Sequence, residues 1–381
     1  MSSVTSSPQP PRAPAWSAPA RARSSVGVVL AVIGILIGGV AFLLVLAYLA
    51  LSLGVASVAV ALVLALIPLA VLLLAVRWID RWEPEPRGAL WFALLWGGGV
   101  SVVLALVVDL GISVAGAGEA TTNAEVLSTT VQAPIVEEIA KGLGVLILAF
   151  AGRRYLDGPV DGIVYAAVIA AGFTFTEDIL YFGTTYVEQG AGGLAGIFVV
   201  REIFSPFAHM MFTACTGAAV GFAVQRTRGA GILGYWALGL VPAMLLHALW
   251  NSAGFFVSDF FAYYLLVQVP FFLIAVVLVI LLRRREAHVT RVRLEEYAAA
   301  GWFLPGEIDW LATPSGRRRA RAWARAQPGG KSAAMQRFTR DATKLAFARQ
   351  RVVLGRADIG QQDDERELLN AIVADRHALL A

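Results

Sequence analysis

The chain is poor in cysteine and in charged residues. Among 381 residues there is a single cysteine, Cys215. One cysteine excludes an internal disulfide and any metal site built from several thiolates, and its apolar surroundings favour a small buried side chain. Charged residues make up 15% of the chain, against about 25% in ordinary globular domains. Since 58% of the residues are hydrophobic, the composition indicates a protein that crosses a membrane several times.

Several common catalytic motifs are also missing. The sequence contains no H-E-x-x-H zinc motif and no G-x-x-x-x-G-K-[ST] phosphate-binding loop. It contains no G-x-S-x-G nucleophile elbow either. These absences argue against a soluble zinc protease of that type, a nucleotide hydrolase and a serine hydrolase.

Long apolar runs fill most of the chain up to residue 282. A helix needs about 20 apolar residues to cross the hydrocarbon core. We therefore predict an all-α polytopic membrane protein with about eight transmembrane helices in residues 26–282. They cover residues 26–51, 55–76, 88–112, 128–151, 160–184, 195–225, 232–256 and 261–282. The Ser-, Pro- and Ala-rich residues 1–25 are expected to form a disordered leader.

Positive charge is distributed unevenly along the chain. Residues 1–282 hold 12 Lys/Arg and 15 Asp/Glu, a net charge of −3, whereas residues 283–381 hold 19 and 12, a net charge of +7. Loops with arginine alternate with loops that lack Lys and Arg. Because basic loops stay on the cytoplasmic side, we predict a multi-pass protein of the cell membrane with both termini in the cytoplasm. Residues 283–381 then form a basic cytoplasmic helical tail. Its juxtamembrane run Arg283 to Arg293 suits anionic lipid headgroups, and the basic run Arg317 to Arg325 is expected on the membrane surface rather than on nucleic acid.

Four of the predicted spans carry polar or ionisable side chains. Such groups are costly inside a bilayer and by default mark a functional site. They are Glu137, Glu138 and Lys141 in the fourth span, Glu177 and Asp178 in the fifth, His209 in the sixth, and His247 with Asn251 in the seventh. At a rise of 1.5 Å per residue, antiparallel spans bring them to one level in the middle-to-outer half of the bilayer. We therefore expect one shared site.

The spacing of the acids predicts how their charges are balanced. Glu137 and Glu138 precede Lys141 by four and three residues, so either can face it on a helix. Adjacent residues differ by about 100° around the axis, so we expect one carboxylate to serve as ligand or base and the other to pair with Lys141. Glu177 and Asp178 have no cation in their own segment, so at least one of them must pair elsewhere or be protonated.

A cluster of carboxylates and imidazoles suits hydrolysis. Glu and His can hold Zn²⁺ at three positions and leave a fourth for water, whose pKa the metal lowers. Without a metal, a carboxylate and a histidine can activate water directly. Two alternatives remain: an ion-coupled transporter, which would carry an internal repeat that we do not find, and a non-catalytic membrane scaffold whose polar groups only join helices.

The ordered set of short motifs resembles the PrsW family of intramembrane proteases, related to the CAAX-processing and bacteriocin-immunity group of membrane proteases. The matching segments are E-P-E-P at 83–86, A-P-I-V-E-E-I-A-K at 133–141, D-G-I-V-Y-A-A at 161–167, G-F-T-F-T-E-D at 172–178, the segment around His209, and H-A-L-W-N at 247–251. The resemblance implies metal-assisted cleavage of a peptide bond in or near the membrane. It also implies a membrane-anchored protein substrate, of which an anti-sigma factor is one class.

Carried over residue by residue, the resemblance implies a catalytic set. It comprises Glu137, Glu138, Glu177, His209 and His247, with Asn251 in support. Within this set we assign Glu138, His209 and His247 as Zn²⁺ ligands and Glu137 or Glu177 as the base that activates water. Family members often carry asparagine at the position of Asp178, which leaves the role of that residue open.

Overall fold

The computed structural model describes residues 25–115, 122–151, 156–227, 229–355 and 359–380. Within these residues every regular element is helical, so the all-α prediction is confirmed. The predicted leader lies outside the described residues except for its last position, where the first helix begins.

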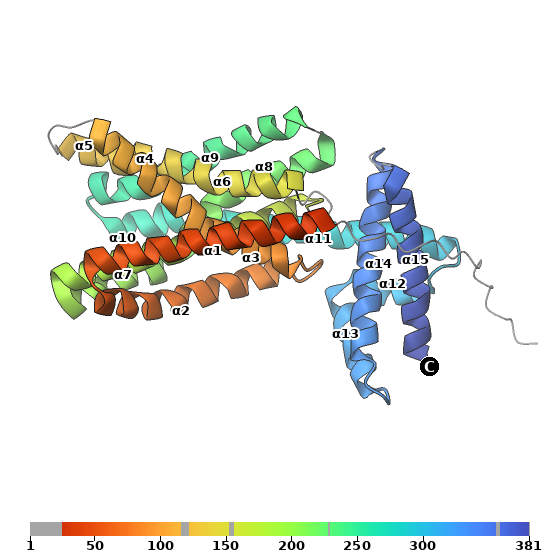
Figure 1. Cartoon of the computed structure of the whole chain (residues 1–381). Helices are drawn as coiled ribbons and strands as arrows, with labels where there is room; N and C mark the ends of the chain where they lie inside the picture. Colours follow the sequence, from red (N-terminus) through yellow and green to blue (C-terminus); the bar gives the residue numbers. More distant parts are fainter. Residues whose placement is uncertain (1–24, 116–121, 152–155, 228, 356–358, 381) are drawn as a thin grey trace, which may run out of the picture.

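The first three quarters of the chain form a bundle of long helices that run roughly side by side (Figure 1). Four short π-helical segments, named η1 to η4, interrupt the α-helices. In chain order the elements are α1 (Ser25–Leu53), α2 (Val55–Ile79), α3 (Arg87–Leu95), η1 (Trp96–Ser101), α4 (Val102–Ala115), α5 (Thr122–Leu127), η2 (Ser128–Gln132), α6 (Ala133–Ala151), α7 (Pro159–Phe198), η3 (Val199–Phe204), α8 (Ala208–Arg226), α9 (Ala230–Phe256), α10 (Phe260–Tyr263), η4 (Tyr264–Gln268) and α11 (Val269–Ala299).

Six helical segments of the described chain are long and apolar enough to span a membrane, so the polytopic prediction is confirmed. One of them, Pro159–Arg226, has 68 residues and folds back on itself, because α7 and α8 pack side by side (Figure 1). A further helix, α6, contains three charged residues within its 19. The segment Pro159–Arg226 counts once here although it contains both α7 and α8, and α6 is not counted. These two points account for the difference between the six segments and the eight predicted spans.

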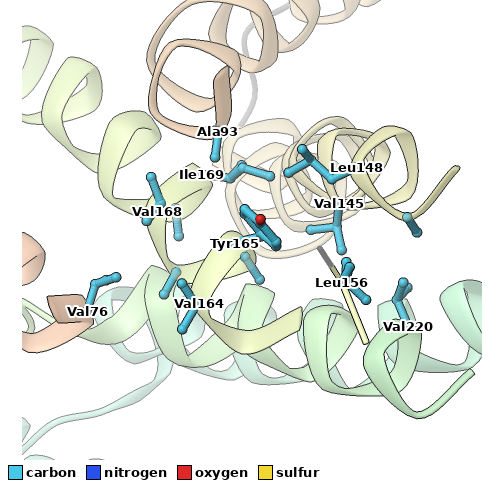
Figure 2. Packing of buried hydrophobic residues seen from close by; sticks show 14 of the residues in the cluster. Val76, Ala93, Val145, Leu148, Leu156, Val164, Tyr165, Val168, Ile169 and Val220 are labelled. Atoms are coloured by element: carbon cyan, nitrogen blue, oxygen red, sulfur yellow. The ribbon is translucent and has the colours of Figure 1, made fainter. Parts of the chain in front are cut away.

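The central element is α7, which is buried without interruption from Pro159 to Thr174. Figure 2 shows Tyr165 and Ile169 of this helix packed against Val145 and Leu148 of α6. Small residues let neighbouring helices approach it closely. A Cβ atom added at Gly217 of α8 would lie 2.2 Å from the carbonyl oxygen of Gly162 on α7, so the backbones of α7 and α8 are in direct contact there.

Helical geometry is irregular in two places beside the predicted site. The π-helical η2 directly precedes α6, whose second residue is Pro134. The missing N–H of Pro134 leaves a carbonyl of the preceding turn without its helical partner. The end of α7 is bent at Gly190, whose φ of 66° is a left-handed conformation that glycine adopts without strain. The π-helical η3 follows, and such segments occur frequently at functional sites.

The tail is a separate packed unit. It contains the end of α11 with α12 (Pro305–Ala312), α13 (Pro314–Ala326), α14 (Ser332–Val353) and α15 (Ile359–Leu380). These helices share a second hydrophobic cluster that includes Leu294, Phe338 and Leu345. The tail lies across the end of the bundle where α1 begins and α2 ends (Figure 1). The boundary predicted after residue 282 remains a prediction, since α11 passes through it without interruption.

Candidate active site

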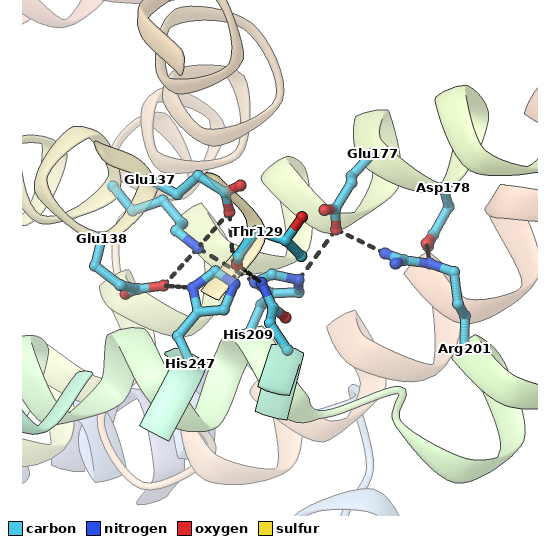
Figure 3. Close-up of polar contacts among 10 residues, drawn as sticks. Thr129, Glu137, Glu138, Glu177, Asp178, Arg201, His209 and His247 are labelled. Atoms are coloured by element: carbon cyan, nitrogen blue, oxygen red, sulfur yellow. Dashed lines mark hydrogen bonds and ion pairs between the residues drawn. The ribbon is translucent and has the colours of Figure 1, made fainter. Parts of the chain in front are cut away.

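Four helices bring the predicted ionisable side chains into one cluster (Figure 3). Glu137 and Glu138 lie on α6, Glu177 on α7, His209 on α8 and His247 on α9. The two imidazole rings are perpendicular, with centroids 4.8 Å apart. The spacing of these residues along separate spans therefore predicted a real spatial cluster.

Three of these side chains are placed so that they can share a metal ion. One ligand atom each of Glu137, His209 and His247 lies within 4.8 Å of the other two. Oxygen Oε2 of Glu137 is buried and has no hydrogen-bond partner in the described part of the chain. It lies 3.8 Å from Nε2 of His247. Zn²⁺ is commonly bound by carboxylate oxygens and imidazole nitrogens. The Glu137 oxygen, together with one nitrogen from each of the two imidazoles, is a donor set that fits this ion.

Glu138, which we prefer as a ligand from the sequence, is occupied by protein contacts instead. Its side chain is fully buried, and Oε1 lies 2.6 Å from Nζ of Lys141 and 3.2 Å from Nδ1 of His247. Its Oε2 accepts a hydrogen bond of 2.9 Å from the Thr213 hydroxyl. Because neighbouring helical residues point about 100° apart, the two carboxylates have different surroundings: Glu138 is held by Lys141 and by Nδ1 of His247, whereas Oε2 of Glu137 lies near Nε2 of His247 without a hydrogen bond among the described residues. The geometry thus favours Glu137 over Glu138 as the third ligand.

Lys141 carries a fully buried ammonium group within the cluster. Besides Glu138, it lies 3.2 Å from Nδ1 of His209 and 3.7 Å from Oε2 of Glu137. The ring centroid of Phe173 is 4.4 Å from Nζ, which adds a cation–π contact. The expectation that one of the adjacent carboxylates pairs with Lys141 is confirmed.

Arg201 belongs to the cluster although our sequence analysis did not select it. Its Nη2 lies 2.6 Å from Oε2 of Glu177, and its Nε donates a hydrogen bond of 2.8 Å to Oδ1 of Asp178. The guanidinium lies over the ring of Tyr181, 4.3 Å from its centroid. The prediction that at least one acid of the fifth span pairs elsewhere or is protonated is therefore confirmed, since both contact Arg201. The available signal was an arginine within an apolar stretch, which is costly there unless it is paired.

Glu177 joins the arginine to the histidines. The same Oε2 atom that contacts Arg201 lies 3.0 Å from Nε2 of His209. The Glu177 side chain keeps 16% of its surface exposed, whereas the Glu138 side chain keeps none. Glu177 is therefore the less enclosed of these two carboxylates.

Asn251 has a supporting contact with the start of α6 and not with the carboxylates. Its Nδ2 donates a hydrogen bond of 3.0 Å to the carbonyl oxygen of Thr129, which belongs to η2. Figure 3 shows Thr129 beside Glu137 and His209. Asn251 thus holds the π-helical segment against α9, one turn beyond His247.

A bundle of membrane-length helices with buried Glu and His side chains at its centre is compatible with a membrane-embedded, metal-assisted hydrolase. The comparison with known families makes the assignment specific. Residues 85–284 match the model of the PrsW family intramembrane metalloprotease, and the chain belongs to this family. The predicted resemblance and the predicted protease class are confirmed, and membership of a metalloprotease family together with the Glu/His/His group points to a metal.

Two relatives illustrate the extent of the similarity. Protease PrsW of Geobacillus kaustophilus (strain HTA426) is 27% identical over 175 residues, which are 45% of this chain and 69% of the relative. Protease PrsW of Oceanobacillus iheyensis (strain DSM 14371 / CIP 107618 / JCM 11309 / KCTC 3954 / HTE831) is 27% identical over 140 residues, which are 37% of this chain and 58% of that relative. No solved structure matches the chain. The family match ends at residue 284, so nearly all of the tail lies outside it.

Proposed function

We propose that this chain hydrolyses a peptide bond of a membrane-anchored protein, with Zn²⁺ held by Glu137, His209 and His247. The observation that carries the proposal is the convergence of one ligand atom from each of these residues within 4.8 Å, inside the helical bundle. Bound there, the metal would supply Lewis acidity and lower the pKa of a water molecule. The competing ligand set has Glu138 in place of Glu137, with the same two histidines. It is the set that we assign from the sequence alone.

Glu138 is proposed as the residue that orients His247. With the proton on Nδ1, His247 donates to Glu138, and its Nε2 is left to face Glu137. A carboxylate on the distal nitrogen of a metal-binding histidine fixes the ring and its tautomer. Lys141 balances the charge of Glu138, and Thr213 fixes the second oxygen.

Glu177 is proposed as the general base. It lies next to His209 and is less enclosed than Glu138, so it can accept a proton from water at the open side of the cluster. Arg201 holds the Glu177 carboxylate through a charge-assisted contact and so fixes its direction. Because Arg201 also binds Asp178, we propose that Asp178 positions Arg201.

The substrate class and the orientation remain proposals that rest on the sequence. The family resemblance suggests an anti-sigma factor as one membrane-anchored substrate. The distribution of arginine suggests that both termini lie in the cytoplasm.

The test measures bound metal and cleavage on the same preparations. Full-length wild type and the variants Glu137→Gln, Glu138→Gln and Glu177→Gln are purified, their zinc is measured by mass spectrometry, and cleavage of a single-span reporter is followed. We expect Glu137→Gln to lose both zinc and cleavage. Glu138→Gln should bind zinc about 10–100-fold more weakly. Glu177→Gln should keep its zinc while kcat falls by about 10²–10⁴-fold.

A matched control is Glu188→Gln, an exposed carboxylate later on α7, which should behave as wild type. Loss of zinc in Glu138→Gln together with retention in Glu137→Gln would restore the ligand set assigned from the sequence. Cleavage by a chain that holds no metal would remove zinc from the mechanism and leave the protease assignment intact.

A further inference from the structure

Helix α13 runs across the end of the membrane bundle, roughly perpendicular to the bundle helices (Figure 1). One face of α13 is fixed in the tail, where Gly316, Ala320 and Ala324 are buried. Trp323 also packs against Trp310 of α12, with ring centroids 5.6 Å apart. The tail therefore sets the direction of α13 and determines which of its faces remain free.

Arg317 joins α13 to the membrane bundle. Its guanidinium lies 3.5 Å from the ring centroid of Trp82 and donates a hydrogen bond of 2.7 Å to the Trp82 carbonyl oxygen. The indole N–H of Trp82 in turn donates to the Thr290 hydroxyl of α11, at 3.1 Å. The loop 80–86, α13 and α11 are thus connected where the spans end.

Three further arginines lie along one side of α13, next to Arg317. Arg318, Arg321 and Arg325 are separated by three and four residues, so their side chains form one stripe. Arg319 falls about 100° further round the helix than Arg318 and is off the stripe. Arg318 and Arg325 are exposed, and Arg321 is half-buried.

Arg81 extends this stripe from the loop 80–86. Arg81 directly precedes Trp82, whose carbonyl oxygen accepts the hydrogen bond from Arg317 of α13. The Arg81 side chain is exposed. Burial, followed by the nearby charges of Arg81, Arg325 and Arg318, lowers the pKa of Arg321. Each of the other three arginines is therefore close enough to repel Arg321.

The charges of this group are not balanced within the described part of the chain. Arg291, Arg337 and Arg376 of the same tail each pair with a carboxylate. No ion pair joins an acid to any of the four arginines among the described residues. Concentrated positive charge of this kind attracts anions.

The arginine group lies next to an arginine–tryptophan contact at the ends of the spans. Arg283 of α11 stacks over Trp78 near the end of α2, 4.3 Å from its ring centroid. Tryptophan and arginine at the ends of spans mark the lipid headgroup region, and Arg81 follows Trp78 by three residues. Since α13 runs across the bundle end (Figure 1), the helix that carries the stripe lies next to the ends of the spans.

We propose that Arg81, Arg318, Arg321 and Arg325 form a docking surface for the headgroups of anionic phospholipids in the adjacent leaflet. The planar fork of donors in arginine fits a phosphodiester, and the charge of such a lipid balances the stripe. Each basic residue near an anionic membrane surface strengthens binding by about fivefold. This role is independent of the ligand and base assigned in the active site.

The test uses the full chain in nanodiscs of phosphatidylcholine with increasing fractions of phosphatidylglycerol. Hydrogen–deuterium exchange of peptides from α13 is followed by mass spectrometry. We expect slower exchange with phosphatidylglycerol and loss of the effect at high salt, because salt screens surface charge. In Arg318→Gln/Arg325→Gln, half-maximal protection should need at least fivefold more phosphatidylglycerol. The control Arg319→Gln/Arg337→Gln removes the same charge from exposed positions off the stripe and should match wild type.

Three outcomes would overturn the proposal. Equal exchange in discs with and without phosphatidylglycerol would show that no anionic lipid docks there. An equal response of the two double variants would show that only net charge matters. Protection in phosphatidylcholine discs on addition of inorganic phosphate or of a DNA duplex would assign the arginines to a soluble phosphate or to nucleic acid.

Discussion

The ionisable side chains of the active site form two charge-balanced pairs joined by a histidine. Lys141 pairs with Glu138, and Arg201 pairs with Glu177. His209 lies between them, with Nδ1 3.2 Å from Lys141 and Nε2 3.0 Å from Glu177. Inside a medium of low dielectric constant, a charged group that loses its partner is strongly destabilising.

Replacement of Lys141 by methionine tests this effect. Because Glu138 is fully buried, loss of the ammonium would leave an uncompensated charge, and we expect the free energy of unfolding to fall by about 3–5 kcal/mol. The measurement is denaturant unfolding of the full chain in detergent. In a Glu138→Gln background, Lys141→Met should lower the free energy of unfolding by much less. An equal loss of unfolding free energy in both backgrounds would contradict the pairing of Lys141 with Glu138.

The sequence predicted which residues meet but not how Glu137 and Glu138 divide their roles. Depth along each span follows from the constant helical rise, which is why the cluster could be predicted. The orientation of α6 about its own axis depends on packing, and it decides which carboxylate faces the histidines. Arg201 was missed because an arginine near a span end also fits an interfacial position.

At the scale of the helices, the site depends on the close approach of α7 and α8. Glu177 and His209 lie on these two helices, and their backbones meet at Gly162 and Gly217. A change in helix separation would therefore move a carboxylate relative to an imidazole.

We expect Gly217→Ala to reduce both stability and activity. The added Cβ would lie 2.2 Å from the Gly162 carbonyl oxygen, so the helices must shift, at a cost of about 1–3 kcal/mol for overpacking. A displacement of about 1 Å at the site can reduce cleavage about 10²-fold. The control is Gly234→Ala on α9, where a Cβ would meet nothing within 4 Å. Wild-type stability in Gly217→Ala would contradict the contact.

The acids of the loop 80–86 anchor it to the bundle. Glu85 accepts a hydrogen bond of 2.5 Å from the Tyr165 hydroxyl of α7, and its own N–H donates to the Asp80 carboxylate. Burial raises the pKa of Asp80 to about 7 and the pKa of Glu83 to about 8. Nearby charges also affect these pKa values. Asp157 raises the pKa of Glu83, whereas Lys344, Arg351 and Arg317 lower it. Arg77 lowers the pKa of Asp80.

These pKa shifts predict lower stability at alkaline pH. A carboxyl whose pKa is raised by folding contributes stability below its ordinary pKa, and this contribution is lost as pH rises through the folded value. The melting temperature of the full chain in detergent should therefore fall between about pH 4 and pH 8, the range from the ordinary to the folded pKa values of these two carboxyls. In Glu83→Gln the side chain cannot deprotonate, so the melting temperature should fall less over this range. In the control Glu295→Gln, which changes a side chain that is 54% exposed, the melting temperature should fall as it does in wild type. An unchanged pH dependence in Glu83→Gln would refute this role.

Most helix positions were predictable to within a few residues, whereas the boundary between the fifth and sixth spans and the helix irregularities were not. The spans predicted at 160–184 and 195–225 are observed as α7, which continues to Phe198, and α8, which begins at Ala208. The seventh span was predicted at 232–256 and is observed as Ala230–Phe256, because apolar length alone defines it. The π-helical η2 and η3 depend on local hydrogen bonding and packing, to which hydropathy is insensitive. The bend at Gly190 likewise has no hydropathy signal.

For the whole molecule, the proposed metal would act as a link among three helices. Glu137, His209 and His247 come from α6, α8 and α9, so an ion bound to all three would hold these helices together. A ligand that binds only the folded state adds RT ln(1 + [L]/Kd) to stability, about 2.7 kcal/mol at 100 times Kd.

Removal of metal should therefore lower the melting temperature. We expect a fall after dialysis of the full chain against a chelator and recovery when Zn²⁺ is added back. Glu137→Gln should melt at the same temperature with and without the chelator. A shift in Glu137→Gln equal to that of wild type would place the metal elsewhere.

The unbroken helix α11 has a structural consequence. It extends over 31 residues from the bundle into the tail, and within the bundle Phe272 stacks on Phe207 with ring centroids 5.3 Å apart. Phe207 lies two residues before His209. The same helix therefore joins the packed core of the tail to an aromatic contact that lies two residues before a histidine of the active site.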